Sequence, residues 1–525
     1  MTSQASIRPY LSQAYLLGLL MVAVGLTLSP FLMGMSQFWL VFVWFVDGFC
    51  TKTINSKLNR FIHNKPAVLL VAIFLMHLVG LLYTTDFQYA MRDLRGKLPI
   101  LVMPFVLSSM PPLDRKRFDL VMLVYVLSVF IATLFSSMSY WRHDYGDVRE
   151  ISHFISHIRF CLNIVFCMAI IGYYLYTRNA PWWGKMIQVG LLLWFAYQVF
   201  IFESLSGYVI LAAVVVVSAV YAFLRWKKGR GWRIAVGVST LAVLLVGTLV
   251  LVRKINPLLN VETVDFSTLD QKTALGNDYW HDTIYNPVED GKFVGLYYCK
   301  KEMQEAWSER SNLPFEGSTT NGENLEATLA RYLTSKDLRK DAQGVMTLTD
   351  EDIRNIEQGV ANYNNWKHPG LQARLSSTLF EYNLYRRFNN PNGGSLAQRI
   401  EFTRASFHII GQHPWFGVGT GDVPQAFSQA YDEIQSPLKE EFRFRAHNQY
   451  LAIAVAFGLV GLAFFLFVLL FPWLSSRRNH TYLYLVFLCI MLLSMFPEDT
   501  LETQAGASLF AFFEAFLLFA APPRQ

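Results

Sequence analysis

The feature that most constrains the fold is a series of apolar stretches, each about long enough to cross a lipid bilayer. A bilayer core of about 30 Å requires roughly 20 apolar residues in a helix. The 525-residue chain contains about twelve such stretches, of which the fourth is short and the seventh and eighth are nearly fused. They lie near residues 11–29, 31–50, 66–83, 97–110, 118–138, 155–177, 186–203, 205–224, 234–253, 448–473, 481–497 and 505–521. The sequence therefore predicts an all-α polytopic membrane protein with about twelve transmembrane helices.

Composition agrees with a membrane protein and excludes an ordinary soluble domain. Hydrophobic residues make up 53% of the chain and charged residues only 16%, against about 25% charged residues in soluble domains. Four of the five cysteines lie in apolar stretches, and only Cys299 lies in polar sequence, so no intrachain disulfide framework is expected. The N-terminus lacks a signal-peptide pattern, and the first apolar stretch is expected to be retained as a span.

Basic residues orient the predicted spans. With the N-terminus in the cytoplasm, every inside loop carries Lys or Arg, as the positive-inside rule requires. These residues are Lys52, Lys57, Arg60, Lys65, Arg115, Lys116, Arg117, Arg178, Lys185, Arg225, Lys227, Lys228, Arg230, Arg233, Arg477 and Arg478. Both termini are therefore expected in the cytoplasm. Residues 1–253 form an N-terminal membrane region of about nine spans, 254–446 an outside loop domain, and 447–525 a C-terminal region of about three spans.

The outside loop domain is polar and is expected to be helical. In "TLTDEDIRNIEQGVANY", Thr349 is a predicted N-cap that acidic residues follow. "SLAQRIEFTRASFHIIGQHP" predicts a second helix that ends before Pro414, after a turn at 389–394. "GVGTGD" follows a helix and lacks a Gly-Lys-Ser/Thr ending, so a phosphate loop is rejected. A tight turn in which Asp422 caps the next helix is expected instead.

Most unusual polar residues fall on the outside rim of the predicted bundle. Charge at a membrane span is costly and marks functional candidates. The candidates are Arg92, Arg95, Lys97, His153, His157, Arg159, Glu203, Ser204, Arg443, Arg445, His447, Glu498, Asp499 and Glu502. Each has an ordinary alternative: basic residues at span ends reach toward headgroups, a single interfacial histidine is often incidental, and "PEDTLET" also fits a solvated turn. Glu514, deep in the last span, has His77 as a candidate partner.

The combination of these residues favours a site for a lipid-linked anion. Arginine binds phosphate oxygens through a planar fork, and a histidine with a pKa near neutrality takes a proton from a hydroxyl. Together they suggest transfer from a lipid pyrophosphate to an acceptor hydroxyl, with inversion at the anomeric carbon. Arg443 and Arg445 are expected to lower the pKa of His447. The acids are expected either to orient basic residues such as Arg159 or to bind a divalent cation.

The segment "RAHNQYLAIAVAFGLVGLAFF" resembles the His-Asn-x-Tyr-Leu segment of the O-antigen ligase and polymerase superfamily. "SLAQRIEFTRASFHIIGQHPWFGVGTGD" resembles the helix and glycine-rich turn that precede that segment in the family. "ISHIRF", "RYLTSKDLRKD" and "PEDTLETQAG" resemble the version found in Bacteroidota. The resemblance covers most of the chain and is most specific from about 395 to 465.

The resemblance implies a metal-independent, inverting membrane glycosyltransferase of the GT-C type. Such enzymes need no cofactor and pass a glycan from undecaprenyl pyrophosphate to lipid A–core on the periplasmic side of the bacterial inner membrane. Their catalytic histidine corresponds to His447 and an essential arginine to Arg399. A second family arginine corresponds to Ser206, in "ESLSG", so Arg159, Arg95 or Arg445 is left to replace it. The remaining candidates support the site: His157, Asn448, Glu498, Asp499 and Glu502.

Several acceptors and one different class of protein remain open. Ligase, polysaccharide polymerase and protein O-oligosaccharyltransferase share these features, and ligase is favoured. A lipid-linked glycan transporter or flippase is the alternative of another class. Transporters place their substrate sites near the midplane of the bilayer. Here the polar residues gather at one rim, apart from Asp47, His77 and Glu514, which favours an enzyme.

Overall fold

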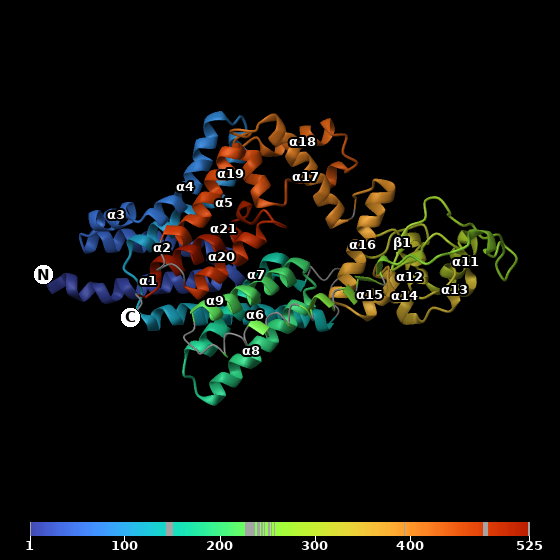
Figure 1. Cartoon of the computed structure of the whole chain (residues 1–525), viewed down its shortest axis with the longest axis horizontal. Helices are drawn as coiled ribbons and strands as arrows, with labels where there is room; N and C mark the ends of the chain where they lie inside the picture. Colours follow the sequence, from blue (N-terminus) through green and yellow to red (C-terminus); the bar gives the residue numbers. More distant parts are fainter. Residues whose placement is uncertain are drawn as a thin grey trace.

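The computed structural model describes residues 2–142, 151–225, 258–392, 394–475 and 481–522, with scattered positions between 231 and 256. A helical bundle forms one part, and a mostly helical lobe extends from it (Figure 1). Both chain termini lie at one end of the molecule, and the lobe lies at the opposite end (Figure 1). This arrangement puts the polar insertion and the termini on opposite sides of the bundle.

The bundle contains the helices that correspond to the predicted spans. Its elements are α1 (Thr2–Leu28), α2 (Pro30–Cys50), α3 (Ile54–His63), α4 (Lys65–Val79) with a 3₁₀ turn (Gly80–Tyr83), α5 (Phe87–Ser109), α6 (Arg115–Arg142), α7 (His157–Thr177), α8 (Trp182–Ile201), α9 (Leu205–Arg225), α19 (Gln449–Ser475), α20 (Tyr482–Ser494) and α21 (Gln504–Ala515), which continues as a π-helical turn (Phe516–Ala520). Eight of the described helices are long and apolar enough to cross a membrane, and α20 and α21 are shorter apolar helices. The chain is therefore a membrane-embedded, all-α protein. The predicted stretch 234–253 lies largely outside the described residues, and a count of twelve stays a prediction.

The core of the bundle is built around α21. Its residues from Gly506 to Ala515 are all buried, and α21 packs against α5. Phe513 makes edge or tilted ring contacts with Tyr125, Phe166 and Phe487, at centroid distances of 4.7, 4.9 and 5.4 Å. Aromatic pairs at such distances add to the stability that apolar burial provides. This packing anchors α21, the helix that directly follows the loop at 497–503.

The lobe contains a short two-stranded sheet and several helices. Strands β1 (Val288–Glu289) and β2 (Lys292–Phe293) pair antiparallel, with Val288 opposite Phe293. Its helices are α11 (Lys300–Arg310), α12 (Leu325–Ser335), α13 (Ala342–Met346), α14 (Asp350–Glu357) and α15 (Tyr363–Lys367), with a 3₁₀ turn at Phe266–Thr268. After the lobe, α16 (Leu371–Phe388) leads back toward the bundle, where α17 (Ser395–Gln412) packs against α18 (Val423–Glu433) and α19 (Figure 1). A 3₁₀ turn at Glu440–Phe442 follows α18. Thr349 and Asp352 form a capping box at the start of α14, which confirms the predicted N-cap.

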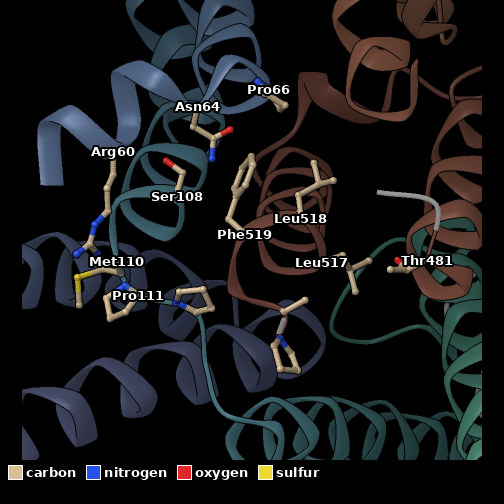
Figure 2. A pocket seen from close by; sticks show the side chains of 13 residues that line it. Arg60, Asn64, Pro66, Ser108, Met110, Pro111, Thr481, Leu517, Leu518 and Phe519 are labelled. Atoms are coloured by element: carbon tan, nitrogen blue, oxygen red, sulfur yellow. The ribbon is translucent and has the colours of Figure 1, made fainter. Parts of the chain in front are cut away.

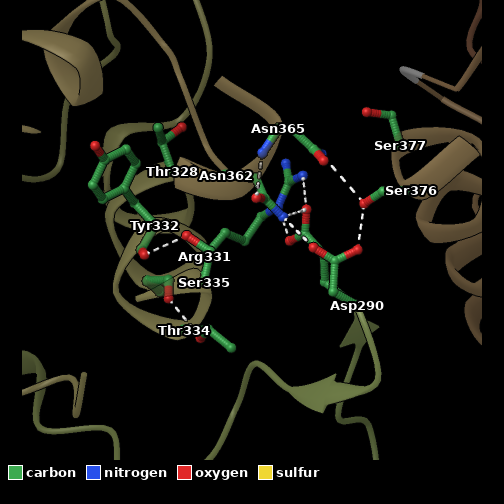
Figure 3. A network of polar contacts seen from close by, with 12 residues as sticks. Asp290, Thr328, Arg331, Tyr332, Thr334, Ser335, Asn362, Asn365, Ser376 and Ser377 are labelled. Atoms are coloured by element: carbon green, nitrogen blue, oxygen red, sulfur yellow. Dashed lines mark hydrogen bonds and ion pairs between the residues drawn. The ribbon is translucent and has the colours of Figure 1, made fainter. Parts of the chain in front are cut away.

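A buried polar network joins the lobe to α16 (Figure 3). The Arg331 guanidinium donates two hydrogen bonds of 2.8 Å to Glu289. Asn362 donates to Glu289 and to Asp290 at 3.1 and 2.9 Å, and the Ser376 hydroxyl of α16 donates to Asp290. An arginine that binds a carboxylate through two parallel hydrogen bonds holds both side chains in one relative orientation. The network therefore holds the lobe on α16, the helix that leads from the lobe toward the bundle.

Helix α19 is broken at Gly458 by a turn from elsewhere in the chain. Gly458 has φ 66° and ψ −169°, a conformation nearly restricted to glycine. The turn after α17 hydrogen-bonds to the exposed backbone there: Val418 N–H donates to Val455 at 3.0 Å, and Leu459 N–H donates to Pro414 at 2.7 Å. A Cβ on Gly458 would lie 2.2 Å from the Trp415 carbonyl carbon. The apolar stretch at 448–473 is therefore not the continuous helix that its sequence predicts.

We expect Gly458→Ala to destabilise the fold by roughly 3 kcal/mol or more, because it combines backbone strain with a clash against backbone atoms. The melting temperature and the monodisperse fraction of the detergent-purified protein should both fall. Gly172→Ala in α7 is the matched control, because a Cβ there meets nothing within 4 Å. Equal stability of the two variants would contradict the close contact at Gly458.

The Asp422 side chain does not cap α18 as predicted. Asp422 occupies the N-cap position, but its side chain makes no capping hydrogen bond. Its carboxylate instead accepts hydrogen bonds from the backbone N–H groups of Thr85 and Asp86, at 2.9 and 2.8 Å. These donors lie directly before α5. The glycine-rich turn is therefore fastened to α5 as well as to α19.

Candidate functional site

Four segments meet at the lobe end of the bundle and form the candidate site. They are the start of α7, the helix α17, the chain at 443–449 and the loop at 497–503. The loop is not a solvated turn, because Asp499 and Thr500 are 2% and 1% exposed. The site therefore combines residues that lie far apart in the sequence.

His447 lies directly before α19 in a strained conformation. Its φ is +45°, in the left-handed region that residues other than glycine rarely adopt. Its ring stacks on Phe402 of α17 at a centroid distance of 5.4 Å. Nδ1 is buried without a hydrogen-bond partner in the described part of the chain, and it lies 3.9 Å from the Asp499 carboxylate. Strain of this kind is frequent at functional sites and requires support from the surrounding structure.

The surroundings of His447 lower the pKa of its imidazole below the usual value of 6.5. Burial contributes most, Asp499 opposes the shift, and Arg399, Arg445 and Arg159 add to it. Arg443 was also expected to lower this pKa, but it is not among the main causes, and its side chain pairs with Asp432 at 2.7 Å. The imidazole is therefore favoured in its neutral form, which can accept a proton.

Three guanidiniums pair with the carboxylates of the 497–503 loop. Glu498 lies 3.3 Å from Arg399 and 3.8 Å from Arg159. Arg445 lies 2.6 Å from Asp499 and 3.7 Å from Glu502. Burial raises the pKa of Glu498, although the arginines oppose the shift. These contacts place the predicted residues Arg159, Arg399 and Arg445 around one group of acids.

Asn448 and Gln449 position the start of α19 against the loop. The Asn448 side chain accepts from Leu451 N–H at 3.0 Å and donates to the Phe496 carbonyl at 2.9 Å. The Gln449 side chain donates to Glu502 at 2.9 Å and accepts from Leu501 N–H at 2.6 Å. Both residues fix the backbone that directly follows His447.

A buried cation lies beneath the acids. Lys97 is 2% exposed and pairs with Asp93 at 2.5 Å and with Glu502 at 2.6 Å. Arg95, two residues away, is exposed, and no ion pair joins it to a described carboxylate. Residues two apart on a helix point about 200° apart. Lys97 therefore joins the cluster, whereas Arg95 does not.

Two further histidines hydrogen-bond to backbone carbonyl groups, and one of them, His157, also lines the cleft described below. His157 bonds through Nε2 to the Phe202 carbonyl and packs against the Phe202 ring. His77 bonds through Nδ1 to the Ile73 carbonyl at 2.9 Å, and both Glu514 oxygens lack a hydrogen-bond partner among the described residues. The proposed pairing of Glu514 with His77 is therefore wrong.

An open cleft of about 830 Å³ lies beside the acids. Its polar wall includes Arg159, Arg399, Glu498 and a third guanidinium, that of Arg374 on α16. Its lining also contains Ser206, together with apolar residues of α9, the helix turn before it and α20: Phe202, Leu205, Val209, Ile210 and Leu493. Arg374 was not singled out in the sequence, because no motif distinguishes it on an amphipathic helix. The cleft combines cationic and apolar surface, as an anionic lipid requires.

His447, Glu498 and Asp499 also have a spacing that could hold a metal ion. One ligand atom from each lies within 4.8 Å of the others. Both carboxylates already face guanidiniums, however, and a divalent cation would be repelled by three nearby positive charges. The charge balance of this cluster suits an anionic ligand better than a cation.

The comparison with protein families matches this part of the chain. Residues 360–466 match the family model described as O-antigen ligase. This segment is therefore similar to the O-antigen ligase family. No curated protein matches the sequence. The matched segment includes Arg374, Arg399, the glycine-rich turn and His447, whereas Arg159 and the loop at 497–503 lie outside it.

Proposed function

We propose that this membrane protein transfers a glycan from undecaprenyl pyrophosphate to an acceptor hydroxyl on the periplasmic face, most simply lipid A–core. The observation that carries the proposal is the cleft in which Arg159, Arg374 and Arg399 line one site together with apolar residues. His447, which is favoured in its neutral form, lies next to this cleft, because its ring nitrogen is within 4.8 Å of Glu498 in the cleft lining. The pyrophosphate would bind to the guanidiniums, and the first part of the polyprenyl chain would lie along Val209 and Ile210.

In the proposed reaction, His447 acts as the general base. It takes the proton of the acceptor hydroxyl while that oxygen forms a bond to the anomeric carbon of the donor glycan. The bond from this carbon to the pyrophosphate oxygen breaks, and the guanidiniums stabilise the leaving diphosphate. Attack opposite the leaving group inverts the anomeric configuration. No metal or cofactor is required by this scheme, because the arginines supply the positive charge.

A second arginine of the family corresponds to Ser206 in this chain. Arg374 is our candidate for the residue that makes the pyrophosphate contact in its place. Arg374 and Ser206 line the same cleft, although they come from α16 and from α9. Arg374 donates to the Ser395 hydroxyl at 3.2 Å, which holds its guanidinium near Arg399. Arg95 is a poor substitute because it is exposed, and Arg445 is committed to Asp499 and Glu502.

The alternatives differ in their acceptor or in their class. A polysaccharide polymerase would use a second glycan, and a protein O-oligosaccharyltransferase would use Ser or Thr.

Deletion of the gene separates these functions, because only the true acceptor loses its glycan. We expect lipid A–core without attached glycan, with restoration by the intact gene. Normal lipid A–core glycosylation in the deletion strain would contradict the ligase proposal. If the protein were a flippase, its deletion would instead leave the lipid-linked donor glycan on the cytoplasmic side of the membrane.

We expect transfer to proceed at an unchanged rate in excess EDTA. The physical reason is that Glu498 and Asp499 each pair with an arginine, which balances their negative charge. The measurement is the initial transfer rate of detergent-purified protein before and after chelation. A loss of activity that magnesium restores would show instead that the His447, Glu498 and Asp499 cluster binds a divalent cation.

A further inference from the structure

The end of the bundle that carries the termini contains a second polar cavity, far from the cleft described above. This cavity of about 500 Å³ is lined by residues at the ends of α1, α2, α3, α5 and α6. It adjoins a groove of about 560 Å³ that has one apolar wall, with Arg60 and Met110–Pro112 common to both. We call the two together the basic cleft. Figure 2 shows the groove, in which Arg60, Asn64 and Ser108 lie opposite Leu517, Leu518 and Thr481.

The basic cleft carries an excess of positive charge. Four basic side chains line the polar cavity, Arg8, Lys57, Arg60 and Arg117, against two acids, Asp47 and Asp114. The acids are already paired, Asp47 with Lys57 at 2.7 Å and Asp114 with Arg117 at 3.3 Å. Arg8 and Arg60 have no carboxylate partner within the described part of the chain, and Arg60 donates only a long hydrogen bond, of 3.4 Å, to the Ser109 carbonyl. The positive charge of these two guanidiniums therefore remains to bind an anion.

A buried hydroxyl also lacks a partner in this cavity. Tyr15 of α1 is 4% exposed and lines the cavity, and its hydroxyl makes no hydrogen bond to any described residue. A buried polar group without a partner costs about 1–3 kcal/mol. A hydroxyl left in this state beside unpaired guanidiniums indicates that a polar ligand completes the site.

The groove and its position indicate a lipid rather than a free anion. Leu517, Leu518 and Phe519 provide an apolar wall that continues directly from the polar cavity. The neighbouring helix α3 is amphipathic, with Lys57 buried and Ile62 64% exposed. A short helix of this kind at the ends of several spans suits the bilayer surface. Basic pockets between transmembrane helices bind anionic lipid headgroups in this way.

We propose that the basic cleft binds an anionic phospholipid. Its phosphate lies between Arg8 and Arg60, the Tyr15 hydroxyl donates to a headgroup oxygen, and one acyl chain follows the wall formed by Leu517, Leu518 and Phe519. This site lies at the opposite end of the bundle from the proposed transfer site and does not depend on that function.

The test is lipid binding to the full-length protein in detergent, measured by native mass spectrometry. Phosphatidylglycerol is the probe, phosphatidylcholine is the zwitterionic comparison, and inorganic phosphate is the competitor. In the variant R8Q/R60Q, we expect the affinity for phosphatidylglycerol to fall about 30-fold, as for two basic residues at an anionic surface. The matched control is K116Q/K185Q, which removes two charges from exposed residues outside the cleft; its affinity should change less than about twofold.

Tyr15→Phe provides a second test that leaves the ring packing unchanged. Loss of one hydrogen bond to a charged group should weaken phosphatidylglycerol binding by about 10-fold or more. Equal affinity for both lipids in the natural protein, equal losses in the two double variants, or unchanged binding by Tyr15→Phe would overturn the proposal. Displacement of the lipid by millimolar inorganic phosphate would identify a free-phosphate site instead, and would also overturn it.

Discussion

His447→Ala should reduce glycan transfer by at least about 10²–10⁴-fold, the usual contribution of a general base. Donor binding should change little, because the guanidiniums of the cleft remain in place. The transfer rate and the affinity for undecaprenyl pyrophosphate are the two measurements. His408→Ala is the matched control, since His408 pairs with the exposed Glu433 at 2.6 Å and lies away from the cleft lining. Its activity should stay near that of the natural protein.

A purely structural role for His447 is separable from proton transfer. The residue has a φ of +45°, and asparagine tolerates this region better than most residues. His447→Asn should therefore keep the local backbone and still lose transfer, because an amide does not take up a proton at neutral pH. Near-normal transfer by this variant would contradict the assignment of His447 as the base.

The pH dependence of transfer follows from the lowered pKa of His447. In the proposed reaction the neutral imidazole is the active form. The transfer rate should therefore rise as the pH increases through the pKa of His447 and reach its maximum above it. Because the pKa lies below 6.5, we expect the acidic limb of the rate profile below that pH. Asp499→Asn removes the group that opposes the shift and should move this limb to still lower pH.

Arg399→Lys should lose transfer by roughly 10–100-fold, the value of a charge-assisted hydrogen bond. The ammonium keeps the charge but not the planar fork that binds a diphosphate. Initial rates at several donor concentrations measure the loss. Because the charge beside His447 is kept, the acidic limb of the pH profile should not move.

Arg404→Lys is the matched control on the same helix. Arg404 is 49% exposed and pairs with Glu401, which is 0% exposed. It lies five residues from Arg399, about 140° around α17. Its conservative variant should keep most of the activity. Equal losses at both positions would indicate that arginines stabilise α17 and would contradict a role for Arg399 in diphosphate binding.

The sequence predicts the helices of the bundle well, because long apolar stretches leave few alternatives. Every predicted span apart from 234–253 coincides with a described helix, and α5 begins ten residues before its apolar stretch. The break at Gly458 was missed because "AFGLVG" continues the apolar pattern on both sides. Its cause is the turn at 414–419, which the local sequence does not indicate.

The candidate site was predictable only in part. Alternation of the spans placed His447 and the acids at one rim, and the structure brings them together. The sequence does not predict which of these rim residues pair with one another. Arg443, for example, pairs with Asp432 and not with His447. Arg374 enters the cleft on α16, which the polar network of the lobe fixes in place. Such contacts depend on tertiary packing, and spacing along the chain does not encode them.

The most direct test of the account is a reaction with purified components. The protein in detergent is mixed with a glycan linked to undecaprenyl pyrophosphate and with lipid A–core, and the product is isolated. We predict transfer of the glycan to a lipid A–core hydroxyl, with inverted anomeric configuration and release of undecaprenyl pyrophosphate, and no product with His447→Ala. Absence of transfer by the natural protein under conditions that keep it folded, or equal product from His447→Ala, would contradict the account.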